Sequence, residues 1–238
     1  MEVKINPKKI LLFLAVLILS LLTLSIVLQI YKFGHLKGSS RFIIDLFDLD
    51  KEFNIPTLFQ TLHLFIVSAV LWGVGLFEKE TNRRLSSYWR VISIVFALAA
   101  CDELLEFHER LISPLQEALK TGGFLQNAWV IPGGAFVLVF ALYLLKFFKS
   151  IPKKTAGLFL LAAGIYLAGA LGIEMIGAKL WTTMGSNNLL YAIIANIEES
   201  SEMIGLLVFD YALLDYLRSN ARSLVIRFTW SGVSPLDR

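Results

Sequence analysis

Long apolar blocks dominate this chain, and they restrict its fold more than any other feature. Hydrophobic residues make up 56% of the 238 positions, and the mean hydropathy is +0.68. A soluble domain is rarely more than about half apolar. A membrane-spanning helix needs about 20 mostly apolar residues to cross roughly 30 Å of hydrocarbon. The sequence therefore predicts an integral membrane protein whose first partner is the lipid bilayer.

The length and spacing of these blocks predict one transmembrane domain over residues 1–238, built as an all-α polytopic bundle. We expect about six spans, at residues 10–30, 57–77, 88–112, 129–148, 155–178 and 189–216. The first is longer than the apolar region of a signal peptide, which is about 7–15 residues, so it is interpreted as a retained span. Phe42–Phe47 predicts a short interfacial helix, and Leu224–Trp230 predicts a short strand or interfacial segment.

Lysine and arginine in the short connections predict the orientation, with both termini in the cytoplasm. Residues 79–84 and 146–154 are rich in basic side chains, whereas two of the expected outer connections carry one lysine each, Lys120 and Lys179. The predicted location is the inner (cytoplasmic) membrane, as a multi-pass protein. Basic residues lie at span ends and form no single patch, so nucleic acid is not an expected partner. The single cysteine, Cys101, excludes a disulfide framework and a cysteine-rich metal site.

Acidic residues lie inside the expected spans, where each ionisable side chain costs at least about 2.5–3.5 kcal/mol on insertion scales. One group of acids is in residues 88–112 and another in residues 189–216. Two further spans each contain one ionisable residue of interest, His63 in residues 57–77 and Glu174 in residues 155–178. No lysine or arginine lies deep in a span. The candidate ligands are Asp102, Glu103, Glu106, Glu109, Glu198, Glu199, Glu202, His63, His108 and Glu174.

The helical period sorts these residues by face. Asp102, Glu106 and Glu109 form one stripe, with His108 on the opposite side, and Glu198 and Glu202 form a second stripe. At about 1.5 Å rise per residue, Asp102 and the second stripe both lie roughly 14–20 Å from the outer ends of their spans. We therefore expect the acids to gather in the outer half of the bilayer. Glycines in residues 155–178, at positions 164, 169, 172 and 177, predict close packing against a neighbouring helix.

The leading interpretation is a cation site that holds a divalent metal ion. Crowded carboxylates in a low dielectric cannot all be ionised without protons or cations to neutralise them. Asp102, Glu106, Glu198 and Glu202 are the preferred ligands, completed by His63 or Glu174, and oxygen-rich sites suit several metals. A metal-dependent membrane enzyme acting on a lipid-like substrate is one form of this interpretation. The sequence lacks the Glu-x-x-His pairs of ferritin-like di-iron proteins.

Several alternatives remain open at this point. The acids could form a proton or cation pathway. The chain could be an accessory subunit of a larger membrane complex, or a homo-oligomer, with the acids facing a partner's basic residues. His63 and His108 could hold one haem. The spans could also be shorter than drawn, which would leave the acids in a wet vestibule.

Three segments resemble a known family. They are Phe47–Thr57, the Asp-Glu-x4-His-Glu pattern at residues 102–109, and the Glu-Glu-Ser-x-Glu-Met pattern at residues 198–203. Their order and spacing are similar to those of a family of uncharacterised bacterial polytopic membrane proteins. The resemblance extends from the first outer connection through the last span. It implies the same topology and the same grouping of motifs, and it implies no activity.

Overall fold

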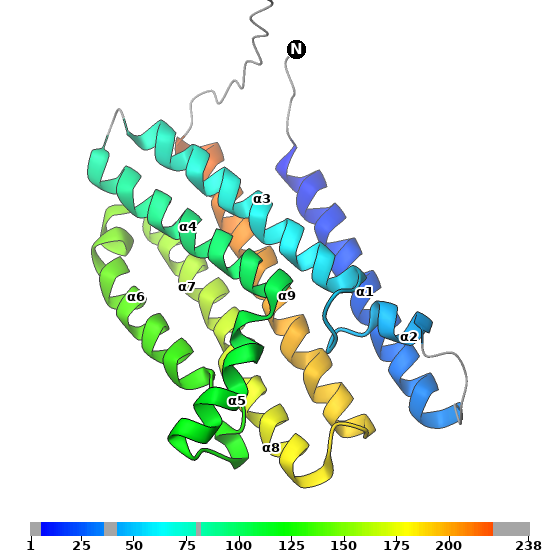
Figure 1. Ribbon diagram of the computed structural model, residues 1–238. Coiled ribbons are helices and arrows are strands. Elements are labelled where there is room, and N and C mark those ends of the chain that lie inside the picture. The colour runs from blue at the N-terminus through cyan, green and yellow to red at the C-terminus, as the bar shows by residue number, and fades with distance from the viewer. Residues whose placement is uncertain (1–5, 36–41, 80–81, 221–238) are drawn as a thin grey trace, which may run out of the picture.

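A computed structural model describes residues 6–35, 42–79 and 82–220, and all regular structure in these residues is helical (Figure 1). The elements are α1 (Pro7–His35), α2 (Phe42–Phe47), α3 (Ile55–Glu78), α4 (Arg83–Leu105), α5 (Phe107–Leu119), η1 (Gly123–Leu125), α6 (Val130–Ser150), α7 (Lys153–Leu167), η2 (Ala168–Ile173), α8 (Glu174–Met184) and α9 (Leu189–Asn220). The all-α prediction and the short helix at Phe42–Phe47 are confirmed. The segment Leu224–Trp230 lies outside the described residues.

Four described segments are long and apolar enough to cross a membrane. They are Pro7–Gly34, Ile55–Glu78, Val130–Ser150 and Lys153–Met184, and they match four of the six expected spans. The last of them is one continuous run through α7, the π-helical segment η2 and α8. Long helices α4 and α9 lie alongside these four in the bundle (Figure 1). Crossing by α4 and α9, and the cytoplasmic placement of both termini, remain predictions.

The surface of the bundle agrees with a lipid environment. Leu12 and Phe13 on α1 are each 66% exposed, and Val139 on α6 is equally exposed. Contiguous apolar surface of this kind is unusual on a soluble monomer. The apolar blocks therefore present outer faces that suit a lipid environment, while their inner faces pack against the other helices.

Local sequence explains where α3 and α4 begin. The Asn54 side chain accepts a hydrogen bond from the backbone N–H of Thr57, and Pro56 occupies the first turn of α3. Asn82 caps α4 in the same way, accepting from the backbone N–H of Leu85 at 3.0 Å. Asparagine is among the strongest capping residues, and proline is favoured in a first turn. Both helix starts are thus encoded locally.

Trp89 on α4 joins four helices near the α3–α4 connection. Its side chain is fully buried, and its ring centroid lies 5.0 Å from Phe147 on α6 and 5.9 Å from Phe159 on α7. Tyr216 on α9 lies 4.9 Å away and donates a hydrogen bond to Glu78 on α3. Edge-on and tilted aromatic pairs at these distances are favourable. This cluster closes one end of the space between α4, α6, α7 and α9.

The expected span 88–112 is wrong beyond its first 18 residues, because α4 ends at Leu105. Glu106 has φ 53° and ψ 40°, a left-handed conformation that few residues other than glycine adopt. Helix α5 then leaves in a new direction (Figure 1). The stripe of Asp102, Glu106 and Glu109 is therefore interrupted in its middle.

Close packing at the glycines of residues 155–178 is confirmed for two of them and wrong for the other two. A methyl group on Gly169 would lie 2.8 Å from the backbone oxygen of Glu198, and one on Gly177 would lie 3.9 Å from the Glu198 carboxylate. The same group on Gly164 or Gly172 would meet open space. Segment η2 thus approaches α9 at a single glycine, Gly169.

This difference gives a matched pair of variants within η2. Gly169→Ala is expected to lower the free energy of unfolding by about 1–3 kcal/mol, because the added methyl group overpacks a backbone contact. Gly172→Ala makes the same change in the same segment without a clash, so it is expected to be neutral or slightly stabilising. Thermal unfolding in detergent measures both. Equal effects of the two substitutions would contradict the close approach.

Candidate functional site

The connection between α2 and α3 turns inward and brings acidic residues to the bundle. Leu49 is buried and packs against Ile18 of α1 and Met203 of α9, and its backbone N–H donates to Ser25 Oγ. Asp48 is buried as well. The connection is therefore not a fully solvated loop, because Asp48 and Leu49 are buried, whereas Asp50 and Lys51 are exposed. The cause is the packing of Leu49 against other helices, which cannot be predicted from the local sequence.

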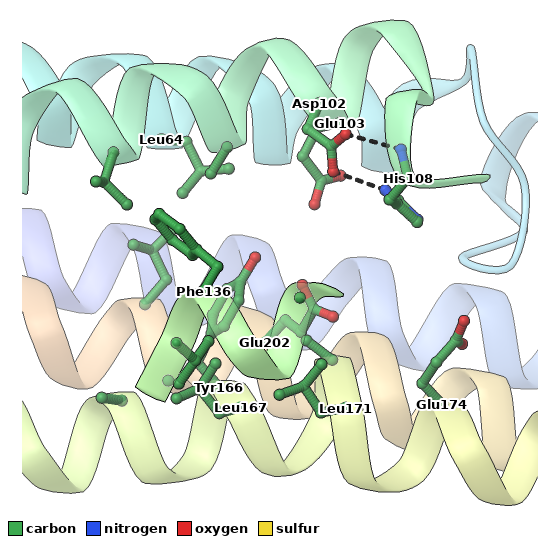
Figure 2. Close-up of a pocket in the computed structure, with 18 of the residues that line it drawn as sticks. Leu64, Asp102, Glu103, His108, Phe136, Tyr166, Leu167, Leu171, Glu174 and Glu202 are labelled. Atoms are coloured by element: carbon green, nitrogen blue, oxygen red, sulfur yellow. Dashed lines mark hydrogen bonds and ion pairs between the residues drawn. The ribbon is translucent and has the colours of Figure 1, made fainter. Parts of the chain in front are cut away.

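A cavity of about 670 Å³ lies between α4, α6, α7 and α9. This volume is within the range of about 300–1,000 Å³ that is typical of small-molecule sites. One part of its wall is apolar and aromatic, with Phe96, Phe140, Phe159 and Phe209. The other part is polar and lies toward α5 and α8: Asp50, Glu52, Asp102, Glu103, His108, Glu109, Asn127, Trp129, Tyr166, Glu174, Tyr191, Glu198, Glu199 and Glu202. Figure 2 shows acids reaching into it from opposite walls.

Eight of the ten predicted site residues line this one cavity: Asp102, Glu103, Glu109, Glu174, Glu198, Glu199, Glu202 and His108. Glu106 and His63 are not among its lining residues. Glu106 is displaced because it occupies the break between α4 and α5. Within the described ranges, no three His, Cys, Asp or Glu side chains stand close enough to form a preassembled metal site. Metal binding therefore stays a prediction, as do the roles of the individual residues.

Asp102 and His108 form a tight pair at the cavity wall (Figure 2). Asp102 Oδ2 lies 2.7 Å from His108 Nδ1, and Asp102 Oδ1 accepts the backbone N–H of His108 at 3.0 Å. Both carboxylate oxygens are thus used by one residue, and only Nε2 of the ring is left for a ligand. A carboxylate placed in this way fixes the orientation of an imidazole. Asp102 therefore holds the His108 ring in one orientation, and the expectation that His108 projects away from it is wrong.

The pKa of His108 reflects this pairing. Its helix, α5, lies beyond the end of α4 and has no buried residue. Partial burial lowers the pKa of the His108 imidazole, but the hydrogen bond and the charge of Asp102 outweigh burial and raise it to about 9. The ring is accordingly protonated at neutral pH when no ligand is bound.

Hydrogen bonds from the α5–α6 connection hold the Glu174 side chain in the cavity wall. Its Oε1 accepts hydrogen bonds from Asn127 Nδ2 at 2.8 Å and Trp129 Nε1 at 2.9 Å. The Glu198 carboxyl group lies within hydrogen-bonding reach of the Glu174 carboxyl group, and it is in van der Waals range of the Cβ position of Gly177. Two carboxyl groups in direct contact require a shared proton or a cation between them. The pair is therefore a place where positive charge is favoured.

Glu202 is buried on α9 and hydrogen-bonds Tyr166 of α7, opposite Glu103 of α4 (Figure 2). Among the ion pairs of the described residues, none joins a lysine or arginine to a carboxylate of this cavity. The polar end of the cavity is thus strongly acidic and has one basic side chain, His108, among its lining residues.

His63 lies elsewhere, contrary to its expected part in the site. Its Nε2 is 2.6 Å from Asp210 Oδ2, and both side chains are buried between α3 and α9. His108 has a different carboxylate partner, Asp102. The haem alternative needs both rings to face one group, and this arrangement does not support it.

Sequence reasoning missed six polar residues of the cavity wall: Asp50, Glu52, Asn127, Trp129, Tyr166 and Tyr191. Tyr191 donates to Asp50 Oδ1 at 3.1 Å, which joins the inward connection to the start of α9. The signal for Asp50 and Glu52 was present, because both belong to the segment Phe47–Thr57 that carries the family resemblance. The other four carry no comparable signal, because they are uncharged and isolated in sequence.

Deprotonation of Asp50 and Glu52 is expected to lower the stability of the protein as the pH rises. Desolvation by the surrounding protein raises the pKa of each carboxyl group to about 7, from 3.8 for Asp50 and 4.5 for Glu52, and the charge of Asp48 adds to the effect at Asp50. The folded protein then binds more protons than the unfolded chain between about pH 4 and 7. Stability contributed by the protonated forms is present at low pH and is lost as pH rises through 7.

The melting temperature in detergent, measured from pH 5 to 8, tests this expectation. It should decrease across the range, and Asp50→Asn with Glu52→Gln should flatten the decrease. Glu117→Gln, an exposed change on α5, serves as the control and should leave the profile unchanged. A melting temperature that rises with pH in the wild-type protein would contradict the assignment.

Neither the curated proteins nor the solved structures contain a match to this chain. A family model described as a domain of unknown function, DUF8692, matches residues 10–217, which include every acidic residue of the cavity. A family of bacterial origin and shared motifs remain predictions. The chain belongs to the DUF8692 family of domains of unknown function.

Proposed function

We propose that this protein binds a lipid-like amphiphile, with a positively charged head at the acidic end of the cavity and an apolar chain at its aromatic end. The observation that carries the proposal is the division of one continuous cavity into two chemically different ends. An apolar pocket with a few convergent polar groups is the usual form of a ligand site. A molecule with both characters satisfies both ends at once.

The negative charge of the cavity wall favours a positively charged head group. Glu103, Glu199 and Glu202 face the same space from α4 and α9, and no lysine or arginine among the lining residues offsets them. An ammonium group would relieve their mutual repulsion, whereas a phosphate or carboxylate would add to it. The carboxylates are spread around the wall and are not gathered about one point. That spread fits an organic cation with several hydrogen-bond donors.

A divalent metal ion is the second candidate for the positive charge. The proximity of Glu174 and Glu198 favours it, and two carboxylates with an imidazole from the same cavity wall are ligands that many metals accept. In that case His108 Nε2 would be the available nitrogen ligand, with Asp102 behind it. Such a metal could also act on the head of the bound amphiphile, which would make the protein an enzyme.

Equilibrium binding of three probes with the same chain separates these possibilities. Octadecylammonium, octadecanol and stearate are added to the purified protein in detergent, and native mass spectrometry counts the molecules retained. We expect one octadecylammonium per chain, bound at least about tenfold more tightly than the other two. Glu199→Gln with Glu202→Gln should reduce this affinity to that of octadecanol. Glu117→Gln should have no effect, because Glu117 is exposed and does not line the cavity.

Elemental analysis of the same preparations tests the second candidate. One metal ion per chain in the wild-type protein, lost in a Glu174→Gln/Glu198→Gln variant, would favour the metal. Equal weak binding of all three probes to wild-type protein, with no metal, would overturn the proposed function.

A further inference from the structure

The walls of the cavity reach the protein surface in two places. At the acidic end, Asp50 and Glu109 line the cavity and are also exposed. On its flank, the exposed lining residues are Phe136 and Ala141 of α6 and Leu160, Ala163 and Gly164 of α7. All five are apolar. By contrast, every lining residue of α4 and α9 is buried or half-buried.

The flank opening has defined limits. Helices α6 and α7 are joined by the short connection at Ile151 and Pro152 at one end. Helix α6 approaches the continuation of α7 near Gly133, where an added methyl group would lie 3.7 Å from Leu171 of η2. The exposed lining residues fall between these two points along both helices.

Small side chains keep this opening wide. Ala141, Ala163 and Gly164 carry at most one methyl group, and a methyl group placed on Gly164 would meet no atom within 4 Å. Glycine and alanine on facing helices often allow close helix contact. Here Gly164 is exposed, lines the cavity and has open space at its Cβ position, so no side chain lies against the cavity wall at this residue.

The surroundings of the opening are apolar. Leu138, Val139 and Leu142 on α6 are 60–66% exposed, and α6 and α7 both belong to segments that can cross the membrane. This side of the bundle therefore faces hydrocarbon in a bilayer. An opening that is apolar and faces hydrocarbon suits the passage of an acyl chain, whereas the acidic opening suits a charged head.

We propose that the opening between α6 and α7 is a lateral entrance, and that the ligand is a bilayer lipid whose acyl chain slides between these helices into the aromatic end of the cavity. This inference rests on the proposed function and adds the source of the ligand and its route. The charged head moves along the membrane surface to the acidic opening, while the chain stays in an apolar environment throughout. The route avoids the transfer of a long chain through water, which costs about 0.8 kcal/mol for each CH₂ group.

The test uses octadecylammonium that carries a photoreactive diazirine at the middle of its chain. The probe is incorporated into phosphatidylcholine vesicles containing the reconstituted protein, irradiated after increasing times, and located by peptide mass spectrometry. In wild-type protein we expect labelling of residues around Phe140 and Ala163. Its rate should follow the mole fraction of probe in the vesicle and not its concentration in water.

Gly164→Leu fills the entrance, and Gly157→Leu is the matched control. Both glycines lie on α7, both have open space at the Cβ position, and only Gly164 lines the cavity. Gly164→Leu should slow labelling at least about tenfold, and Gly157→Leu should leave the rate unchanged. Ala163→Leu is a second variant at the same entrance, should Gly164→Leu prove unstable in the melting assay.

The outcomes separate this inference from the proposed function. Wild-type protein that binds octadecylammonium at equilibrium, but labels at the same rate in all variants, would overturn the lateral entrance and leave the binding function intact. A dimer in the native mass spectrum that Gly164→Leu dissociates, without chain labelling, would overturn it by showing that a second copy covers the opening. Absence of equilibrium binding to wild-type protein would instead be the failure of the proposed function.

Discussion

Replacement of His63 by leucine should lower the free energy of unfolding by about 3–5 kcal/mol, the usual result of breaking a buried pair from one side. The Asp210 carboxyl group would lose its partner at 2.6 Å and remain between α3 and α9. His63 is 4% and Asp210 7% exposed, so water cannot replace the lost interaction. Thermal and denaturant unfolding in detergent measure the loss.

Two further variants show whether pairing is the cause. His63→Leu combined with Asp210→Leu removes both polar groups, and it should recover most of the lost stability because no unpaired group is left. Lys154→Gln breaks the exposed ion pair of Lys154 and Asp215, and it should lower the stability far less than His63→Leu, because an exposed ion pair contributes little. A double variant as unstable as His63→Leu would show that the loss comes from packing and not from the unpaired carboxyl group.

Asp102→Ala should release both His108 and the start of α5. The substitution removes the contacts to the His108 ring and to its backbone N–H, and a hydrogen bond to a charged group contributes about 1.5–3 kcal/mol. Helix α5 has no buried residue to hold it in place. Amide hydrogen exchange in α5 should therefore become about a hundredfold faster, which corresponds to about 3 kcal/mol of local stability.

The control for this substitution is Glu117→Ala, on the exposed face of α5, which should leave exchange in the helix unchanged. Asp102→Asn keeps the shape of the side chain but removes its charge, so the pKa of His108 should fall from about 9 toward its ordinary value of 6.5. Nuclear magnetic resonance titration of the imidazole measures this change. A His108 pKa that is unaffected by Asp102→Asn would contradict the positioning role.

The sequence predicted those parts of the fold that hydropathy encodes. Residues 10–30, 57–77, 129–148 and 155–178 are apolar enough to identify their helices without tertiary information. The break at Glu106 was not predictable in this way, because the residue is not glycine and no proline lies beside it. The Asp102 carboxylate can accept a hydrogen bond from the backbone N–H of His108 only because the helix breaks at Glu106. A prediction that assumed an unbroken helix therefore placed His108 on the wrong face.

The candidate site was predictable as a collection of acids but not as a cavity. Charge within apolar blocks marked eight lining residues, since an ionisable side chain in a span is conspicuous. Asp50 and Glu52 lie in a polar connection, where acids are unremarkable, and they reach the cavity because Leu49 packs against Ile18 and Met203. His63 was conspicuous for the same reason as the acids, yet its contact with Asp210 on another helix gives it a separate place.

An experimental structure of the protein in lipid nanodiscs made from its own membrane tests the central claim most directly. We expect elongated density in the cavity, running from the aromatic residues Phe140 and Phe159 to the carboxylates of Glu199 and Glu202, with its charged end among the carboxylates. The same density should be absent from the Glu199→Gln/Glu202→Gln variant. A cavity that is filled only by water in both proteins, or closed by movement of α6 against α4, would contradict the account.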